Sequence, residues 1–211
     1  MMDPKEIVAQ GYDQIAARYA EWAPSVRVEE RAHYTNVLLE SLPESAEILE
    51  LGCGSGLPTT RRLAERFHVT GVDISGQQIG LARQHLPDVN FVHADMTTLN
   101  LSPSSFDGVA AFYAITHVPR EEHQKLLNSI VRWLRPGGLL VASMGAKQSA
   151  GDVEEEWLGA PMYFSHFDAE TNRRFVEQAG LQVVTASVEV AEEDGEGVPF
   201  LWVVARKPVR P

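Results

Sequence analysis

The sequence predicts an α/β fold, a three-layer sandwich built on a seven-stranded, mostly parallel sheet whose last strand is antiparallel. Two observations carry this prediction. Between residues 48 and 143, short apolar segments alternate with helical patterns, which is typical of parallel strands joined by crossover helices. After residue 180, two apolar segments follow each other with a connector too short for a helix, so they must form an antiparallel pair.

Two helices are expected before the first strand. Asp3 is a suitable N-cap, Pro4 fits the first helical position, and Glu6 completes the spacing of a capping box. A second helix is expected over Val26–Leu42, because Pro43 cannot continue it. Both helices precede the glycine-rich part of the chain and form an N-terminal helical segment.

The remaining elements follow from the apolar periodicity and from residues that start or stop helices. Strands are expected at Ile48–Leu51, Val69–Asp73, Val89–His93, Phe106–Phe112, Leu139–Ser143, Leu181–Val190 and Val198–Arg206. Helices are expected at Pro58–Phe67, Ser75–Leu86, Arg120–Leu134 and Asp168–Ala179. The chain therefore divides into the helical segment 1–44 and a single core domain, 45–211. Residues 145–167 fit neither pattern, and their aromatic content after the fifth strand predicts an insertion beside a binding site.

Composition restricts the partners. The formal net charge is −11, which disfavours nucleic acid and an anionic membrane surface, since both need a basic footprint. No apolar run approaches a membrane span, and the first residues lack the pattern of a signal peptide. The single cysteine, Cys53, excludes an intrachain disulfide and fits a reducing cytoplasm. We expect no metal, because the acidic runs 154–156 and 192–196 are typical of solvated faces.

A glycine-rich turn, Glu50–Gly56, follows the first predicted strand. Gly52, Gly54 and Gly56 allow a ligand to approach the backbone closely, because no Cβ intervenes. The dinucleotide-binding pattern requires a further glycine where this chain has Leu57.

Two carboxylates follow the next two predicted strands. Asp73 ends the second strand, where a carboxylate can accept both ribose hydroxyls of an adenosine. Asp95 follows the third strand and can meet an adenine amino group. Three consecutive strand ends therefore face one cleft, which predicts an adenosine-type ligand.

As an ordered set, these motifs resemble those of class I S-adenosylmethionine-dependent methyltransferases of the small-molecule type, which have a Rossmann-like fold. The resemblance covers roughly residues 45–206, and the terminal antiparallel pair belongs to it. The motifs that carry it are Glu50–Gly56, Val72–Ile74, Ala94–Met96, Phe106–Asp107 and Leu134–Leu139. It implies S-adenosylmethionine as the cofactor, with S-adenosylhomocysteine as the product.

The resemblance also implies roles for single residues. Gly52 and Gly54 would lie along the methionine part of the cofactor, and their neighbours Glu50 and Cys53 in the same turn would also belong to the cofactor site. Asp73 would hold the ribose, while the side chains that contact adenine or border the sulfonium would be Ile74, Asp95, Met96 and Phe112. The first helix resembles a lid, in which Tyr19, or alternatively Tyr12, closes over the methionine carboxylate. The alternative is that both tyrosines only pack the helix on the sheet.

An oxygen or nitrogen acceptor needs a base if a proton must be removed from it. The candidates for this base are His117 and His166. Both are also candidates for substrate binding, with Tyr113 and Tyr163. The alternative for each histidine is a hydrogen-bonded structural role, which we expect for the other five histidines: His33, His68, His85, His93 and His123.

The sequence therefore predicts methyl transfer from S-adenosylmethionine to a small-molecule acceptor, which no motif specifies. A nicotinamide-dependent oxidoreductase is the second hypothesis, against which the glycine spacing and the terminal hairpin both count. A third is a non-catalytic protein that binds the cofactor. Methylation of protein or RNA is a minor alternative, and the acidic charge disfavours RNA.

Overall fold

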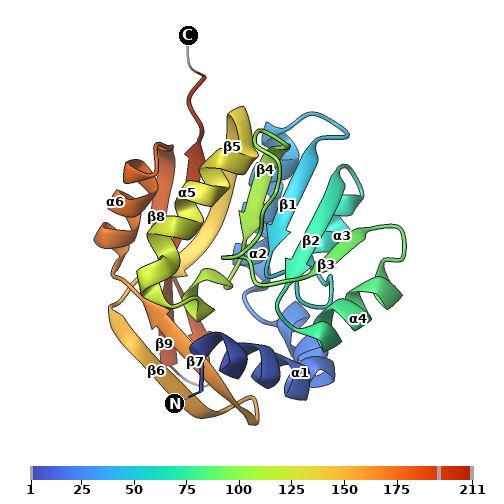
Figure 1. The fold of residues 1–211 in the computed structure, drawn as a ribbon, viewed down its shortest axis with the longest axis vertical. Coiled ribbons are helices and arrows are strands. Elements are labelled where there is room, and N and C mark those ends of the chain that lie inside the picture. The colour runs from blue at the N-terminus through green and yellow to red at the C-terminus, as the bar shows by residue number, and fades with distance from the viewer. Residues whose placement is uncertain (1, 194–195, 210–211) are drawn as a thin grey trace.

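The structure is a computed structural model that describes residues 2–193 and 196–209. A seven-stranded sheet runs through it in the order β3-β2-β1-β4-β5-β9-β8, and a separate hairpin pairs β6 with β7 (Figure 1). The helices are α1 Pro4–Trp22, α2 Val28–Ser41, α3 Thr59–Ala64, α4 Gly76–His85, α5 His123–Trp133 and α6 Ala169–Gln178. The strands are β1 Glu47–Leu51, β2 His68–Asp73, β3 Asn90–His93, β4 Phe106–Ala111, β5 Leu134–Gly145, β6 Ser149–Trp157, β7 Ala160–His166, β8 Gln182–Glu193 and β9 Glu196–Arg206.

The sheet topology confirms the predicted fold. Strands β1 to β5 pair in parallel with their neighbours, and β9 lies antiparallel between β5 and β8. The chain moves from β1 to β2 on one side and returns to β4 on the other, so the strand order reverses beside β1. Ligands of open α/β sheets bind at the carboxyl ends of the strands at such a reversal. The tip of the β8–β9 connector, residues 194–195, is outside the described residues.

Two apolar layers hold the helices on the sheet. On one face, α5 buries Leu126, Leu127, Ile130 and Trp133 at helical spacing, and α6 adds Val176. On the other face, α2 and α3 pack with Tyr34, Leu38 and Leu63 against the sheet. Each fully buried apolar side chain contributes about 1.5–3 kcal/mol. These layers fix the sheet that carries the strand ends.

The helix ends show what periodicity alone predicted and what it did not. Ser75 caps α4 as predicted, with its Oγ accepting from the N–H of Gln78 at 3.1 Å. Asp3 caps α1 through the N–H of Lys5 at 2.9 Å. The second helix begins two residues later than predicted, because Arg27 has a left-handed backbone conformation with φ +53°. Before α5, a separate 3-10 turn forms over Arg120–Glu122.

Residues 145–167 contain the hairpin β6–β7, which packs against α1 through β7 (Figure 1). We call α1 and this hairpin together the cover. The cover has a small apolar core of its own, to which Val8 and Ile15 of α1 and Met162 of β7 contribute. Gly11 sits where a Cβ would collide with the backbone of Pro161, so the helix and the strand lie in close contact. Within the expected lid segment 1–44, only α1 belongs to the cover, because α2 packs on the sheet.

Among the described residues, no helix combines the length and the apolar character needed to cross a membrane.

Candidate active site

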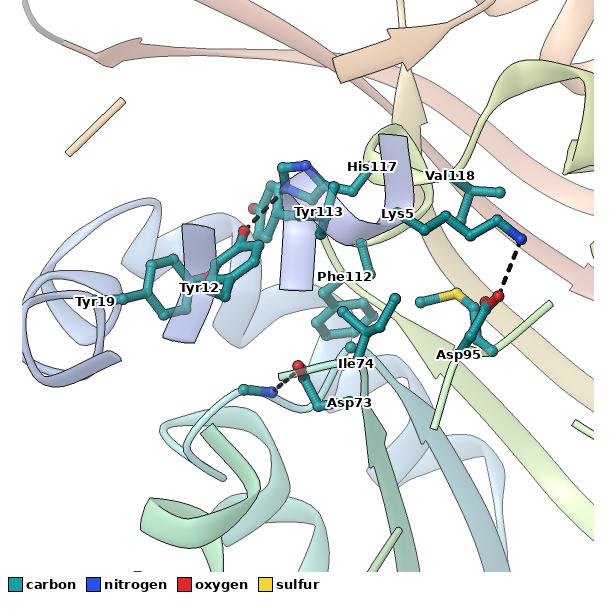
Figure 2. A pocket seen from close by; sticks show the side chains of 15 residues that line it. Lys5, Tyr12, Tyr19, Asp73, Ile74, Asp95, Phe112, Tyr113, His117 and Val118 are labelled. Carbon is teal, nitrogen blue, oxygen red and sulfur yellow. Dashed lines mark hydrogen bonds and ion pairs between the residues drawn. The ribbon is translucent and has the colours of Figure 1, made fainter. Parts of the chain in front are cut away.

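A cavity, partly open to solvent, lies at the carboxyl ends of β1, β2 and β4, with α1 over it. Eleven of the residues predicted for the site contribute to its walls: Tyr12, Tyr19, Gly52, Gly54, Asp73, Ile74, Asp95, Met96, Phe112, Tyr113 and His117. The cavity therefore brings together residues from the glycine-rich turn, from three strand ends and from α1 (Figure 2).

The glycine-rich turn presents bare backbone to the cavity. The N–H groups of Gly52 and Cys53 donate to the carbonyl of Val72 at 2.8 and 3.0 Å, which fixes the end of β1 beside β2. Gly52 and Gly54 have φ +75° and +53°, a region that favours glycine. A Cβ at Gly54 would lie 3.6 Å from the ring of Tyr19 and would fill the space between the turn and α1. The turn is therefore a cradle that a side chain would close.

Asp73 is anchored by backbone N–H groups. Its Oδ2 accepts from Gly54 at 2.8 Å and its Oδ1 accepts from Ser75 at 2.9 Å. Burial raises the pKa of Asp73, while these two hydrogen bonds act in the opposite direction. A carboxylate has about four lone-pair positions. Two of them stay free for hydroxyl donors in the cavity, which Asp73 lines (Figure 2).

Asp95 is tied to α1 by Lys5. The Nζ of Lys5 lies 3.0 Å from Asp95 Oδ2, 2.8 Å from Thr97 Oγ1 and 2.8 Å from Glu122 Oε1. Partial burial acts to raise the pKa of Asp95, but hydrogen bonds from Thr97 and Lys5 outweigh it and lower the pKa. Lys5 therefore joins α1 to the strand end expected to face adenine (Figure 2).

Tyr12 and His117 form a hydrogen-bonded pair with a defined direction (Figure 2). His117 Nδ1 lies 2.9 Å from the carbonyl of Tyr163, which can only accept, so Nδ1 carries the proton. Burial lowers the pKa of His117 to about 4, so the ring is neutral at pH 7. Its Nε2 therefore accepts the hydroxyl proton of Tyr12 over 2.9 Å.

Arg31 supplies a cation beside the same tyrosines. Its guanidinium carbon lies 4.6 Å from the centre of the Tyr113 ring, and its buried Nε has no hydrogen-bond partner among the described residues. Its charge acts to lower the pKa values of Tyr12, Tyr19 and Glu50, so it lies within electrostatic range of all three. An unpaired guanidinium in this position can receive a carboxylate in two hydrogen bonds.

Two predicted cofactor residues, Glu50 and Cys53, lie behind the turn and do not contribute to the cavity wall. Glu50 is buried and accepts from Thr60 Oγ1 at 2.6 Å. Burial raises the pKa of Glu50 to about 7. Cys53 packs into a small apolar cluster with Ile79 and Phe91. These side chains support the turn from behind.

Tyr163 and His166 also lie outside this cavity. The ring of Tyr163 packs in the core of the cover, and the residue meets His117 through its backbone carbonyl. His166 hydrogen-bonds to the carbonyl of Lys147 and lines a separate surface hollow with that lysine. The structure therefore brings His117, but not His166, to the cofactor cavity.

Sequence reasoning missed Lys5 and Arg31. Arg31 stands on the buried stripe of α2, four residues before Thr35 and seven before Leu38, and a charge on such a stripe could have drawn attention. Lys5 gave no such signal, because Asp95 and Glu122 follow it by 90 and 117 residues. The described residues contain no group of three or more histidine, cysteine or acidic side chains arranged to hold a metal.

Comparisons with known sequences agree with this geometry. Residues 48–138 match a family described as a methyltransferase domain. The chain is 35% identical over 132 residues to a trans-aconitate 2-methyltransferase of Variovorax paradoxus, an alignment that covers 59% of this chain and 50% of that protein. It is 26% identical over 155 residues to a malonyl-(acyl-carrier protein) O-methyltransferase of Enterobacter lignolyticus, covering 72% and 59%. The chain spans about half the length of the curated relatives it matches.

Solved structures show the same fold. The N-methyltransferase NodS of Bradyrhizobium japonicum, in complex with S-adenosyl-L-homocysteine, matches with a TM-score of 0.72 and 20% identity over 98% of this chain and all of that chain. Magnesium protoporphyrin IX methyltransferase of Synechocystis, with bound S-adenosylmethionine, matches with a TM-score of 0.73 and 16% identity over 98% of each chain. These likenesses confirm the predicted architecture.

Proposed function

We propose that the chain is a class I S-adenosylmethionine-dependent methyltransferase and that it transfers a methyl group from S-adenosylmethionine to a small-molecule acceptor. The observation that carries the proposal is the buried Asp73 carboxylate beside the bare glycine turn. Two of its lone-pair positions are free, and Asp95 ends the neighbouring strand. This arrangement fits the ribose and adenine of the cofactor.

When bound, S-adenosylmethionine supplies a methyl group already activated on a sulfonium. The protein then has to align the acceptor and exclude water. In our proposal Asp73 accepts the ribose hydroxyls, Ile74, Asp95 and Met96 contact the adenine, and Phe112 borders the sulfonium. Glu50 and Cys53 contribute by supporting the turn. The helix α1 acts as a lid, because Lys5, Tyr12 and Tyr19 all join the walls of the cavity.

We assign the methionine carboxylate of the cofactor to Arg31 and Tyr19. The hydroxyl of Tyr12 is already directed at His117, which favours Tyr19 over Tyr12 for this role. The buried, unpartnered Nε of Arg31 supports the assignment, because such a donor gains from a carboxylate. Arg31 does not line the cofactor cavity itself but the hollow that adjoins it beyond Tyr12 and Tyr19, so the carboxylate would have to lie where the two meet.

Calorimetry with S-adenosylhomocysteine and with 5′-methylthioadenosine tests the role of Arg31 and the proposed function. The two probes share the adenosine, but the second lacks the amino-acid end. We expect Arg31→Met to weaken S-adenosylhomocysteine about tenfold and to leave 5′-methylthioadenosine unchanged, with Arg31→Lys intermediate. Equal losses for both probes would refute the role of Arg31. A folded protein that binds neither probe would refute the proposed function.

The alternative enzyme class is a nicotinamide-dependent oxidoreductase. The match of residues 48–138 to a methyltransferase domain favours methyl transfer over hydride transfer. A change in NADH fluorescence on titration, without any S-adenosylhomocysteine binding, would reverse this order. A non-catalytic cofactor-binding protein would bind S-adenosylhomocysteine but transfer no labelled methyl group to any acceptor in a small-molecule library.

The small-molecule acceptor follows from the acidic charge and the covered cavity, which disfavour nucleic acid. The trans-aconitate and malonyl-carrier relatives are consistent with such an acceptor. The cytoplasmic setting stays a prediction that rests on the single cysteine.

A further inference from the structure

A second hollow adjoins the cofactor cavity on the acceptor side. The two share Tyr12, Tyr19, Tyr113 and His117 in their walls, so they meet where these four side chains stand. Its other walls are largely aromatic, and we call it the aromatic chamber. The rings added by the second hollow are those of Trp22, Trp157, Phe164 and Phe200.

Trp157 stands at the centre of these rings. Its ring centre lies 5.6 Å from that of Tyr12, 6.0 Å from Trp22 and 5.8 Å from Phe164. Aromatic rings at such distances favour edge and offset contacts and add to the energy of area burial. A flat aromatic guest can make the same contacts with these walls.

Three charged side chains line the aromatic chamber, Arg27, Arg31 and Glu193, and two of them, Arg27 and Glu193, are paired with each other. Arg27 is held by Glu30, Glu193 and the carbonyl of Val198. His117 is neutral, because burial lowers its pKa to about 4 and outweighs the hydrogen bond to the carbonyl of Tyr163, which acts in the opposite direction. Arg31 is assigned above to the cofactor. With Arg31 taken up by the cofactor carboxylate, as proposed above, no unpaired charge would remain among the described lining residues for a charged acceptor, and burying an unpaired charge is costly.

The wall between the two hollows carries one directed hydrogen-bond chain. Its order is Tyr12 hydroxyl to His117 Nε2, then His117 Nδ1–H to the carbonyl of Tyr163. Because Tyr12 donates to His117, its oxygen keeps lone pairs that can only accept. The groups that face Tyr12 are Tyr19, which also shares a side-chain hydrogen bond with it, Asp73 and Arg31, so one lone pair of the Tyr12 oxygen is left for the acceptor. A hydroxyl donor therefore completes this chain, whereas a carboxylate would meet another oxygen lone pair.

We propose, on the basis of the proposed function, that the acceptor is a planar aromatic hydroxyl compound, a phenol. Its ring lies in the aromatic chamber, and its hydroxyl donates to the Oη of Tyr12. Tyr12 is then a catalytic residue that touches the acceptor, and His117 acts through it. Tyr12, which the sequence analysis placed in the cofactor site, and His117, which it placed as a base, thus form one proton path.

The proton and electron balance of the step is closed within this path. The acceptor oxygen forms a bond to the methyl carbon as the bond from that carbon to sulfur breaks, and the pair stays on sulfur. The acceptor proton moves to Tyr12, whose own proton moves to His117 Nε2. A positive charge leaves the sulfur while another arrives on the imidazole, so the net charge of the buried site does not change. Because the net charge of the buried site stays the same, His117 can accept the proton although it is neutral in the free protein.

A set of matched probes tests the acceptor class, with labelled S-adenosylmethionine as donor. The phenols are 2-naphthol and 4-methylphenol, and the controls are decahydro-2-naphthol, 2-naphthoate and 2-(aminomethyl)naphthalene. We expect kcat/KM for 2-naphthol to exceed that of each control at least tenfold. A control that matches 2-naphthol, or no transfer to either phenol by a protein that binds S-adenosylhomocysteine, would overturn this inference alone. Absence of S-adenosylhomocysteine binding would instead overturn the proposed function.

Variants test the path. Tyr12→Phe keeps the ring and removes the hydroxyl, so kcat for 2-naphthol should fall on the order of 100-fold with the S-adenosylhomocysteine Kd within threefold. The loss should shrink for 6-cyano-2-naphthol at alkaline pH, because this more acidic probe arrives already ionised. Tyr34→Phe is the matched control, since that hydroxyl contacts Glu189 on β8 outside the chamber. If Tyr12→Phe lowered kcat equally for both naphthols, or did not lower it for 2-naphthol, the proton path through Tyr12 to His117 would be contradicted.

Trp157→Leu tests the chamber separately. It should raise KM for 2-naphthol at least tenfold and leave the S-adenosylhomocysteine Kd within threefold. An unchanged KM would place the acceptor ring elsewhere.

Discussion

The two walls of the cofactor cavity are built in different ways. One wall is the sheet edge, which we define by Gly52, Gly54, Asp73 and Asp95, and the other is the cover. At the sheet edge, backbone hydrogen bonds between β1 and β2 and from Gly54 and Ser75 to Asp73 fix the positions. The sheet edge is therefore formed by the same bonds that form the fold.

The cover is held by side chains instead. Lys5 reaches Asp95 and Glu122, and Asp13 accepts from Ser75 Oγ at 2.6 Å and from the N–H of Gln77 at 3.0 Å. Its apolar core is separate from the cores of the sheet. Local opening follows elements with few buried contacts to the rest of the protein. We therefore expect the cover to move when ligands enter and the sheet edge to stay in place.

The largest effect should come from the sheet edge. Asp73→Ala should weaken S-adenosylhomocysteine on the order of 100-fold, about 3 kcal/mol, because the two charge-assisted hydrogen bonds that we propose with the ribose would be lost. It should also lower the free energy of unfolding by about 1–3 kcal/mol, since the N–H groups of Gly54 and Ser75 lose their acceptor. Calorimetry and urea unfolding measure the two effects.

Asp73→Asn is the matched control for this change. It keeps one carbonyl oxygen as an acceptor and should recover most of the stability but little of the affinity. If Asp73→Ala bound S-adenosylhomocysteine as tightly as the wild-type protein, the sheet edge would not be the ribose site.

A smaller effect should appear in the pH dependence of stability. Burial raises the pKa of Glu50 to about 7, so the folded state favours the protonated carboxyl. The stability that this proton contributes is fully present below the unfolded pKa and is lost as the pH rises through about 7. Relative to Glu50→Gln, the wild-type protein should lose on the order of 2 kcal/mol between pH 5 and 8. If urea unfolding gave the same difference in free energy of unfolding between the wild-type protein and Glu50→Gln at every pH in this range, Glu50 would be charged in the folded state.

The smallest effect on stability should come from the cover. Lys5→Met removes the contacts with Asp95, Thr97 and Glu122, yet Lys5 is partly exposed, so unfolding should change by less than about 1 kcal/mol. The dissociation of S-adenosylhomocysteine should become several-fold faster, because the lid helix is held less tightly. Stopped-flow displacement measures this rate, and Lys125→Met, an exposed lysine on α5, is the control. A large loss of stability with unchanged dissociation would mean that Lys5 supports the fold and not the lid.

The sheet and its edge could be predicted because their information is local. Alternating apolar segments identified all seven strands, and Ser75 marked the start of α4. The short connector between the last two strands required the antiparallel pair. Asp73 followed its strand directly, so its place in the cavity came from strand direction alone.

The partners on the cover could not be predicted in the same way. Tyr12 meets His117 across 105 residues, and Lys5 meets Glu122 across 117. The aromatic residues after 145 gave no periodicity that identified a hairpin, so Tyr163 and His166 could not be oriented. Only the register of β6 on β7 shows that Tyr163 presents its carbonyl to His117 and that His166 lies outside the cofactor cavity.

The sequence by itself determined the sheet, the glycine turn and the carboxylate that ends β2, because each depends on residues close together in the chain. The tertiary structure alone decided which tyrosine faces His117, where the charge of Arg31 lies and how α1 is tied to the strand ends. Those features depend on the docking of separate elements, which fixes side-chain positions over long sequence distances. For this reason the motifs predicted the residues that we propose for the cofactor, whereas the residues that we propose for the acceptor came together only through the packing of the cover.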